Sequence, residues 1–72
     1  MIIKCLYKTA SFDVNDMSKL IKFYPKKKYK CIEKGIDKDG IKWFEVFNSQ
    51  GSIYATEQQI TTLFKIIKKE GK

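Results

Sequence analysis

The chain contains no histidine and no arginine, so all 15 of its basic residues are lysines. Without histidine, a nucleophilic side chain would need a lysine or a carboxylate as its base. Most of the carboxylates are expected to cap helices or to form turns. Glu45 alone lies in mid-strand, where we expect it to pair across the sheet with Lys28 or Lys30. No glycine-rich phosphate-binding motif is present. We therefore predict that the protein is not an enzyme and that it uses no cofactor.

The sequence has only two cysteines, Cys5 and Cys31, and no CxxC pair. A structural zinc site normally needs four cysteine or histidine ligands, so none is predicted within this chain. Free cysteine is among the most buried residue types, and we expect both thiols to be buried and reduced. A disulfide would require their strands to be neighbours, and we predict against it.

Long hydrophobic runs are also missing. No apolar stretch approaches the roughly 20 residues that a membrane-spanning helix needs. The first residues show no basic segment followed by an apolar one, so no secretory signal is predicted and a cytoplasmic location is expected. The 72 residues, 43% of them hydrophobic, are enough for one small core, and residues 1–72 are expected to form a single domain.

The net charge of +7 is concentrated near the N-terminus, where residues 1–30 hold eight lysines and two aspartates. Arginine is the residue that reads guanine edges and holds phosphate bidentately, whereas lysine acts as a hydrated point charge. Two explanations of the lysine excess stay open. It could serve an anionic partner, or it could result from AT-rich coding.

Residues 26–56 are predicted to form the centre of the fold, as three short strands in a meander. A further strand is expected at 2–7. The turn at 37–40 (DKDG) suits a type I turn followed by a glycine with positive φ. A second turn is expected at 48–51 (NSQG). The three strands of the meander are predicted at 28–34, 41–48 and 52–55.

Two helices are predicted to flank this sheet, which makes the fold class α+β. The first spans about 13–24, with Asp13 as its N-cap and Pro25 as its end. It rests on a stripe of apolar residues at helical spacing, namely Val14, Met17, Leu20, Ile21 and Tyr24.

The second helix is predicted at about 57–68. It would begin with a capping box between Thr56 and Gln59, and its apolar face would hold Ile60, Leu63, Phe64 and Ile67. The competing interpretation is one helical turn at 57–62 followed by a strand at 63–68. We favour the helix, because the apolar residues at 63, 64, 66 and 67 do not alternate strictly.

The alternation within the central strands gives the sheet two apolar faces. Such a sheet is too apolar to leave one face in water, so something is expected to cover the second face. The two predicted helices could do so, or a partner could. The core face is predicted to hold Tyr29, Cys31, Phe44, Val46, Ile53 and Ala55, and the second face Ile32, Trp43, Phe47 and Tyr54.

Four segments together resemble a known family: residues 1–6, 28–32, 43–47 and 48–54, with the sequences MIIKCL, KYKCI, WFEVF and NSQGSIY. They are similar to small SH3-like barrel proteins of phages and prophages of Gram-positive bacteria. The resemblance implies an SH3-like fold and a prophage origin, and it supplies no site residues.

The leading functional hypothesis is a small non-enzymatic binding or regulatory protein that acts through contact with a host protein or through homodimerisation. The alternative is a nucleic-acid-binding accessory protein, because aromatic residues on a small sheet flanked by lysines can stack and steer single strands. Either partner would use the same predicted surface, which consists of Ile32, Trp43, Phe47, Tyr54, Lys26, Lys27, Lys28 and Lys30.

Overall fold

The computed structural model describes residues 1–68 and contains seven strands and one helix among them. Antiparallel sheet dominates the fold, so the α+β class is confirmed in a sheet-rich form. The elements, in chain order, are β1 (Ile2–Cys5), β2 (Thr9–Phe12), β3 (Leu20–Phe23), β4 (Lys28–Ile36), β5 (Lys42–Asn48), β6 (Gly51–Thr56), α1 (Glu57–Leu63) and β7 (Phe64–Lys68).

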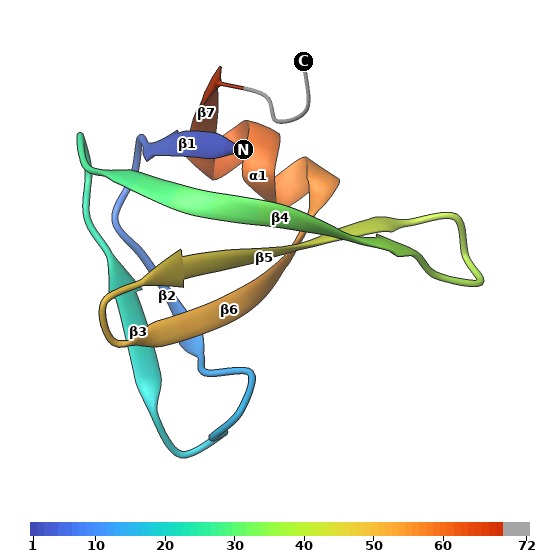
Figure 1. The fold of residues 1–72 in the computed structure, drawn as a ribbon, viewed down its shortest axis with the longest axis horizontal. Coiled ribbons are helices and arrows are strands. Elements are labelled where there is room, and N and C mark those ends of the chain that lie inside the picture. The colour runs from blue at the N-terminus through green and yellow to red at the C-terminus, as the bar shows by residue number, and fades with distance from the viewer. Residues whose placement is uncertain (69–72) are drawn as a thin grey trace.

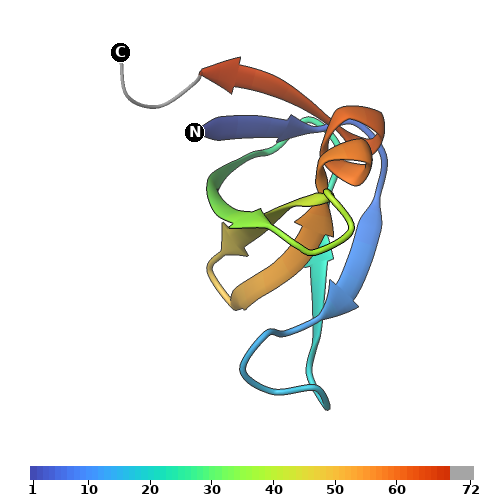
Figure 2. The ribbon, with the colours of Figure 1, turned by 90° about the vertical axis from the view of Figure 1, so that its right-hand side faces the viewer.

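Five of the strands form one antiparallel sheet with the order β6-β5-β4-β1-β7 (Figure 1). The predicted meander is therefore present as β4-β5-β6, and β1 pairs with β4 as a neighbour of the meander. The remaining strands, β2 and β3, form a separate hairpin. Figure 2 shows this hairpin beside the large sheet, with α1 between the end of β6 and β7.

A single hydrophobic core lies between the large sheet, the hairpin and the helix. The predicted core face is confirmed, because Cys31, Phe44, Val46, Ile53 and Ala55 are buried and Tyr29 packs against them. Alternation places these residues on one face of the sheet, which we call the inner face. Ile3 and Cys5 of β1 and Phe64 of β7 extend the inner face across the sheet. Ile21 and Phe23 of β3 and Ile60 of α1 cover it.

The helix predicted at 13–24 is wrong, because this segment forms a loop and then strand β3. Of the expected apolar stripe, Met17 is 72% exposed, whereas the fully buried Ile21 and Phe23 alternate at the strand period of two. Asp13 and Asp16 accept hydrogen bonds from the backbone N–H groups two residues further on. The acidic side chains that resembled a helix start therefore stabilise turns instead.

Helix 57–68 is also wrong over its second half, and the competing interpretation is close to the structure. The predicted capping box between Thr56 and Gln59 is confirmed, but the helix ends at Leu63. Residues 64–68 then form β7 and pair with β1, which would otherwise be the edge of the sheet. The pairing skips Ile67, and this irregularity explains why the apolar residues do not alternate strictly.

The turn at 37–40 is confirmed by a hydrogen bond from the Gly40 N–H to the Asp37 carbonyl and by the positive φ of Gly40. Between β3 and β4, Pro25 and Lys26 occupy the middle of another turn, in which Lys26 has a φ of 73°. No helix within residues 1–68 is long and apolar enough to cross a membrane.

Candidate binding surface on the outer sheet face

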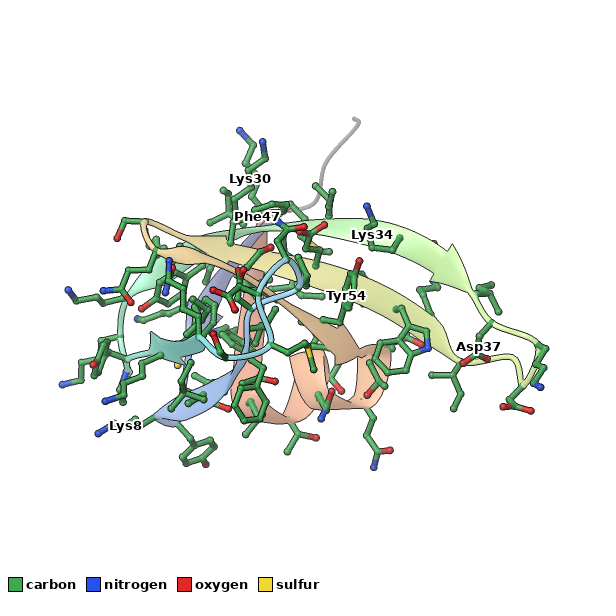
Figure 3. All side chains as sticks on the ribbon, turned by 90° about the horizontal axis from the view of Figure 1, so that it is seen from below. Lys8, Lys30, Lys34, Asp37, Phe47 and Tyr54 are labelled. Atoms are coloured by element: carbon green, nitrogen blue, oxygen red, sulfur yellow. The ribbon has the colours of Figure 1, made fainter. Side chains whose placement is uncertain are left out.

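The face of the large sheet opposite the core, which we call the outer face, carries the side chains that alternate with the buried ones. Figure 3 shows Lys30, Lys34 and Phe47 projecting from this side, while α1 and the hairpin lie on the other side. From β7 to β6, the outer face consists of Lys65 and Lys68; Ile2 and Lys4; Lys28, Lys30, Ile32 and Lys34; Trp43, Glu45 and Phe47; and Ser52 and Tyr54.

Three of these lysines form a row across neighbouring strands. Lys4 of β1 is paired directly with Lys28 of β4 on one side and with Lys65 of β7 on the other. None of the three makes an ion pair within residues 1–68. Like charges directly opposite each other destabilise a sheet. The outer face therefore carries a positive field that folding does not require.

A pocket of about 360 Å³ adjoins this row, where β3, β4 and the β5–β6 turn meet. The side-chain amide of Asn48 donates to the carbonyl of Lys22 at 2.9 Å and so ties the β5–β6 turn to β3. The hydroxyl of Tyr29 accepts from the N–H of Tyr24 at 3.0 Å, which fixes another wall. Four lysines and no carboxylate line the pocket, and its residues are Lys22, Tyr24, Lys27, Lys28, Tyr29, Lys30, Phe47, Asn48, Ser49 and Gln50.

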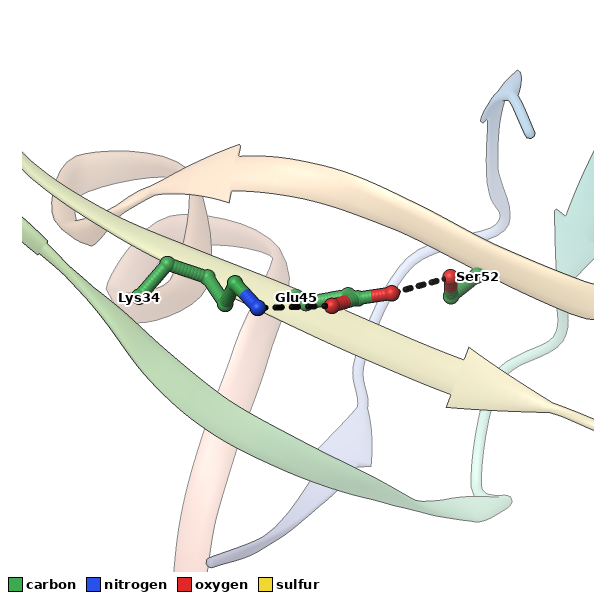
Figure 4. A network of polar contacts seen from close by, with 3 residues as sticks. All are labelled: Lys34, Glu45 and Ser52. Carbon is green, nitrogen blue, oxygen red and sulfur yellow. Dashed lines mark hydrogen bonds and ion pairs between the residues drawn. The ribbon is translucent and has the colours of Figure 1, made fainter. Parts of the chain in front are cut away.

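In the middle of the outer face, the buried carboxylate of Glu45 is held from two sides (Figure 4). Its Oε1 lies 3.4 Å from Nζ of Lys34, and its Oε2 accepts a 2.5 Å hydrogen bond from the hydroxyl of Ser52. The expected pairing of Glu45 with Lys28 or Lys30 is wrong, because a β-bulge near Gly35 brings Lys34 to it instead. The only carboxylate of the outer face within residues 1–68 is thus neutralised locally, so the charge of the remaining lysines is not offset.

Beyond Glu45, an apolar cleft of about 320 Å³ is lined by Lys34, Trp43 and Tyr54. The indole N–H of Trp43 donates to Oδ2 of Asp37 at 2.9 Å. This hydrogen bond is the main reason why the pKa of Asp37 is lowered, and the backbone N–H groups of Ile41 and Asp39 add to the effect. The ring of Trp43 is therefore fixed by the β4–β5 turn, and the ring of Tyr54 is 52% exposed.

The structure divides the predicted surface between two sites. The lysine pocket contains Lys27, Lys28, Lys30 and Phe47. The cleft contains Trp43 and Tyr54, and half-buried Ile32 lies between them, paired with Glu45. Lys26 lines neither site.

Sequence reasoning missed the lysines that neighbouring strands bring to this face: Lys4, Lys65, Lys68, Lys22 and Lys34. Three of them lie on β1 and β7, whose pairing partners no local pattern identifies. Lys22 lay within the segment assigned to a helix, although the alternation of Ile21 and Phe23 was a usable signal. Lys34 was within the predicted strand at 28–34. Its pairing with Glu45 was missed because it depends on the bulge after Glu33.

Of the two alternatives for covering the second face, cover by two helices does not occur, because residues 13–24 form a loop and strand β3 instead of a helix. The hairpin and α1 both pack on the inner face. On the outer face, Glu45 and Ser52 are buried, whereas Tyr54 is 52% exposed. The 13–19 loop instead closes the edge of β6, where the buried Asp13 accepts from the Ser52 N–H and the Val14 N–H donates to the Ser52 carbonyl. Gly51 is required beside it, because a Cβ there would collide with the Asp13 carboxylate.

The two cysteines are buried free thiols, as predicted. Burial raises the pKa of Cys5, and it raises the pKa of Cys31 to about 11. Residues 1–68 contain no cluster of three or more histidine, cysteine or acidic side chains that could hold a metal ion. The outer face offers attraction of anions by its lysines, together with contact to the aromatic rings of the cleft.

Comparisons of the chain with protein-family models, with curated proteins and with solved structures found no match.

Proposed function

We propose that this chain is a small, non-enzymatic, cytoplasmic binding protein whose outer sheet face holds the phosphate backbone of a nucleic acid strand. One observation carries the proposal: the row formed by Lys65, Lys4 and Lys28 continues into a pocket lined by four lysines and no carboxylate. Uncompensated lysines on one face are the electrostatic footprint of a polyanion-binding protein. A bound phosphate backbone would relieve the repulsion between the paired lysines.

The absence of arginine fits binding without base-specific readout. Lysines act as point charges on phosphates, and such contacts position a strand but carry no sequence information. The expected partner is therefore nucleic acid of many sequences, bound in a way that depends on salt.

A salt titration tests this function. Fluorescence anisotropy of a labelled oligothymidylate should report binding in low salt, and log K should fall linearly as log[salt] rises. Each lysine that neutralises one phosphate of a single strand contributes about 0.7 to that slope. The double variant Lys28→Gln/Lys30→Gln should lower both affinity and slope.

The matched control is Lys38→Gln, which removes one lysine charge from the β4–β5 turn, away from the pocket and the lysine row. It should leave the salt slope unchanged. The proposal fails if the wild-type protein does not bind the oligonucleotide in low salt. It also fails if Lys38→Gln weakens binding as much, per charge removed, as the double variant Lys28→Gln/Lys30→Gln.

Homodimerisation, or contact with a host protein, through the same face is the second candidate. The observation in its favour is the apolar cleft of Trp43 and Tyr54, of which Tyr54 is 52% exposed, with half-buried Ile32 on the same face. A small chain near the lower size limit of a stable domain would also gain core by dimerising. Two copies would, however, bring their lysine rows together, which favours an anionic partner instead. Light scattering over a range of protein concentrations in low and high salt distinguishes these possibilities. Dimerisation predicts a doubled mass, and a larger fraction of dimer in high salt, where the repulsion between lysines is screened.

We also propose that the fold belongs with the small SH3-like barrels of phages and prophages that the sequence resembles. The β4-β5-β6 meander with β1 beside it supports this assignment. An experimental structure compared with such a barrel, strand by strand, tests it.

A further inference from the structure

The cleft lined by Lys34, Trp43 and Tyr54 lies outside the lysine pocket. The pocket begins on the same face at Lys28, Lys30 and Phe47 and extends to Lys22 of β3. The walls of the cleft are two aromatic rings and the stem of a lysine, and its volume is about 320 Å³. Small-molecule sites are concave, largely apolar and about 300–1,000 Å³ in size. The cleft is therefore large enough for a flat ring and offers two surfaces against which a ring can stack.

Two of the three side chains of the cleft are held in place before any ligand binds. Trp43 is held by its hydrogen bond to Asp37 at 2.9 Å, and Lys34 is held by its 3.4 Å ion pair with Glu45. Side chains that are already ordered lose little conformational entropy when a ligand binds. The ion pair also keeps the stem of Lys34 beside the rings.

A single-stranded oligonucleotide of a few nucleotides would be long enough to reach from the cleft to the lysine pocket. Phe47 lines the pocket and Trp43 lines the cleft, and they stand four residues apart on β5. At about 3.3 Å per residue this separation is roughly 13 Å. That is about four times the 3.4 Å spacing of nucleotides along one strand of B-DNA. Figure 3 shows Phe47, Tyr54 and Asp37 following one another along the sheet in the same direction.

We infer that unpaired bases stack on Trp43 and Tyr54 while phosphates several nucleotides further along the same strand lie in the lysine pocket, so that the protein selects single strands over duplexes. This inference rests on the proposed nucleic-acid function. Stacking needs an exposed base face, which a base inside a duplex does not offer. Aromatic stacking also accepts every base, which agrees with the absence of arginine-mediated base readout.

Trp43 provides a direct readout, because it is the only tryptophan in the chain. We expect its fluorescence to be quenched by an oligothymidylate of about 12 nucleotides, within the range of known single-strand site sizes. Inorganic polyphosphate has the charge but no bases, so it should compete for the lysines without quenching Trp43. A duplex of the same length should bind more weakly than the single strand.

The matching variants alter one ring at a time. Tyr54→Ala should weaken single-strand binding roughly 5- to 150-fold, which corresponds to about 1–3 kcal/mol per stacked base. Tyr54→Phe, which keeps the ring, should bind like the wild type. Tyr7→Ala removes another exposed tyrosine, one that lies outside the cleft, and serves as the control. Circular dichroism confirms that each variant is folded.

The outcomes separate this inference from the function on which it rests. Salt-dependent binding with no change in Trp43 emission, or with Tyr54→Ala equal to wild type, would overturn stacking and leave the phosphate-binding function standing. Equal affinity for duplex and single strand would overturn the selectivity. A lack of binding in low salt by anisotropy would overturn both.

Discussion

The indole N–H of Trp43 and the carboxylate of Asp37 form a 2.9 Å hydrogen bond that joins the β4–β5 turn to the outer face of the sheet. The second oxygen of the same carboxylate accepts from the backbone N–H groups of Asp39 and Ile41. One side chain thus shapes the turn and orients the only tryptophan. Because all three bonds favour the charged carboxylate, the pKa of Asp37 lies below its usual 3.8.

The first prediction concerns this pair. A carboxyl group whose pKa is lowered by folding contributes stability that is fully present above its unfolded pKa and is lost as pH falls through its folded pKa. We therefore expect Trp43 emission to stay constant from neutral pH down to about 3.8 and to change below it, when Asp37 is protonated. The measurement is a fluorescence titration in acid.

In Asp37→Asn, the change in Trp43 emission that follows protonation of Asp37 should be absent. Asp16→Asn is the control, since the pKa of Asp16 is also lowered, but through hydrogen bonds to Ser18 and not to Trp43. An identical titration curve for the wild type and Asp37→Asn would contradict the prediction.

A second prediction addresses how the 13–19 loop is attached to the sheet. Asp13 is buried, and its carboxylate accepts from the N–H groups of Ser52 and Asn15. Asp13→Ala would leave the Ser52 N–H unpaired, so we expect a loss of about 1–3 kcal/mol in the free energy of unfolding. Asp16→Ala, at an exposed position in the same loop, should cost less, about 0.5 kcal/mol, because water can replace the hydrogen bonds from Ser18. Urea denaturation of both variants measures the difference, and equal losses would show that the edge contact is unimportant.

Asp13 also shows why part of the fold could not be predicted. An aspartate that accepts a hydrogen bond from an N–H two residues later occurs both at helix starts and in turns. The choice between them was made by Ser52, 39 positions away, whose N–H needs a partner at the edge of β6. The second helix shows the same limit. Its capping box is local and was predicted, whereas its end at Leu63 depends on pairing with β1.

The candidate site was predictable where it depended on alternation within one strand. Trp43 and Phe47 share the outer face because they stand an even number of residues apart on β5. The lysine row was not predictable, because it is made by strands that are distant in sequence. Lys4 and Lys65 become neighbours only when β7 joins the sheet.

A third prediction follows from that row. Lys4→Gln removes the charge that faces both Lys28 and Lys65, so the free energy of unfolding should rise by about 0.2–1 kcal/mol. The same variant should bind oligothymidylate more weakly, with a salt slope smaller by about 0.7. Thermal unfolding and anisotropy measure the two effects. If Lys4→Gln is more stable than the wild type but binds more weakly, the charge of Lys4 serves binding at a cost in stability.

Lys38→Gln is again the control, and neither its stability nor its affinity should change by more than the error of the measurement. A gain in stability without any loss of affinity would mean that Lys4 repels its neighbours but does not contact the ligand. A loss of stability in Lys4→Gln would show that the repulsion is negligible beside the packing of the lysine stem on the sheet.

The last prediction concerns the thiol of Cys31, which is fully buried in the core and has a pKa raised to about 11 by desolvation. Because the thiolate is the reactive form, native protein should resist alkylation near neutral pH and react only after unfolding.

Folding raises the pKa of Cys31 above the unfolded value of 9.0. Its contribution to stability is therefore complete below pH 9.0 and disappears as pH rises toward about 11. Cys31→Ala should lose less stability than the wild type over that interval, as thermal unfolding at a series of pH values would show. Rapid alkylation of Cys31 in the folded protein would contradict this prediction, because the β4–β5 core would then have to open on the time scale of the reaction.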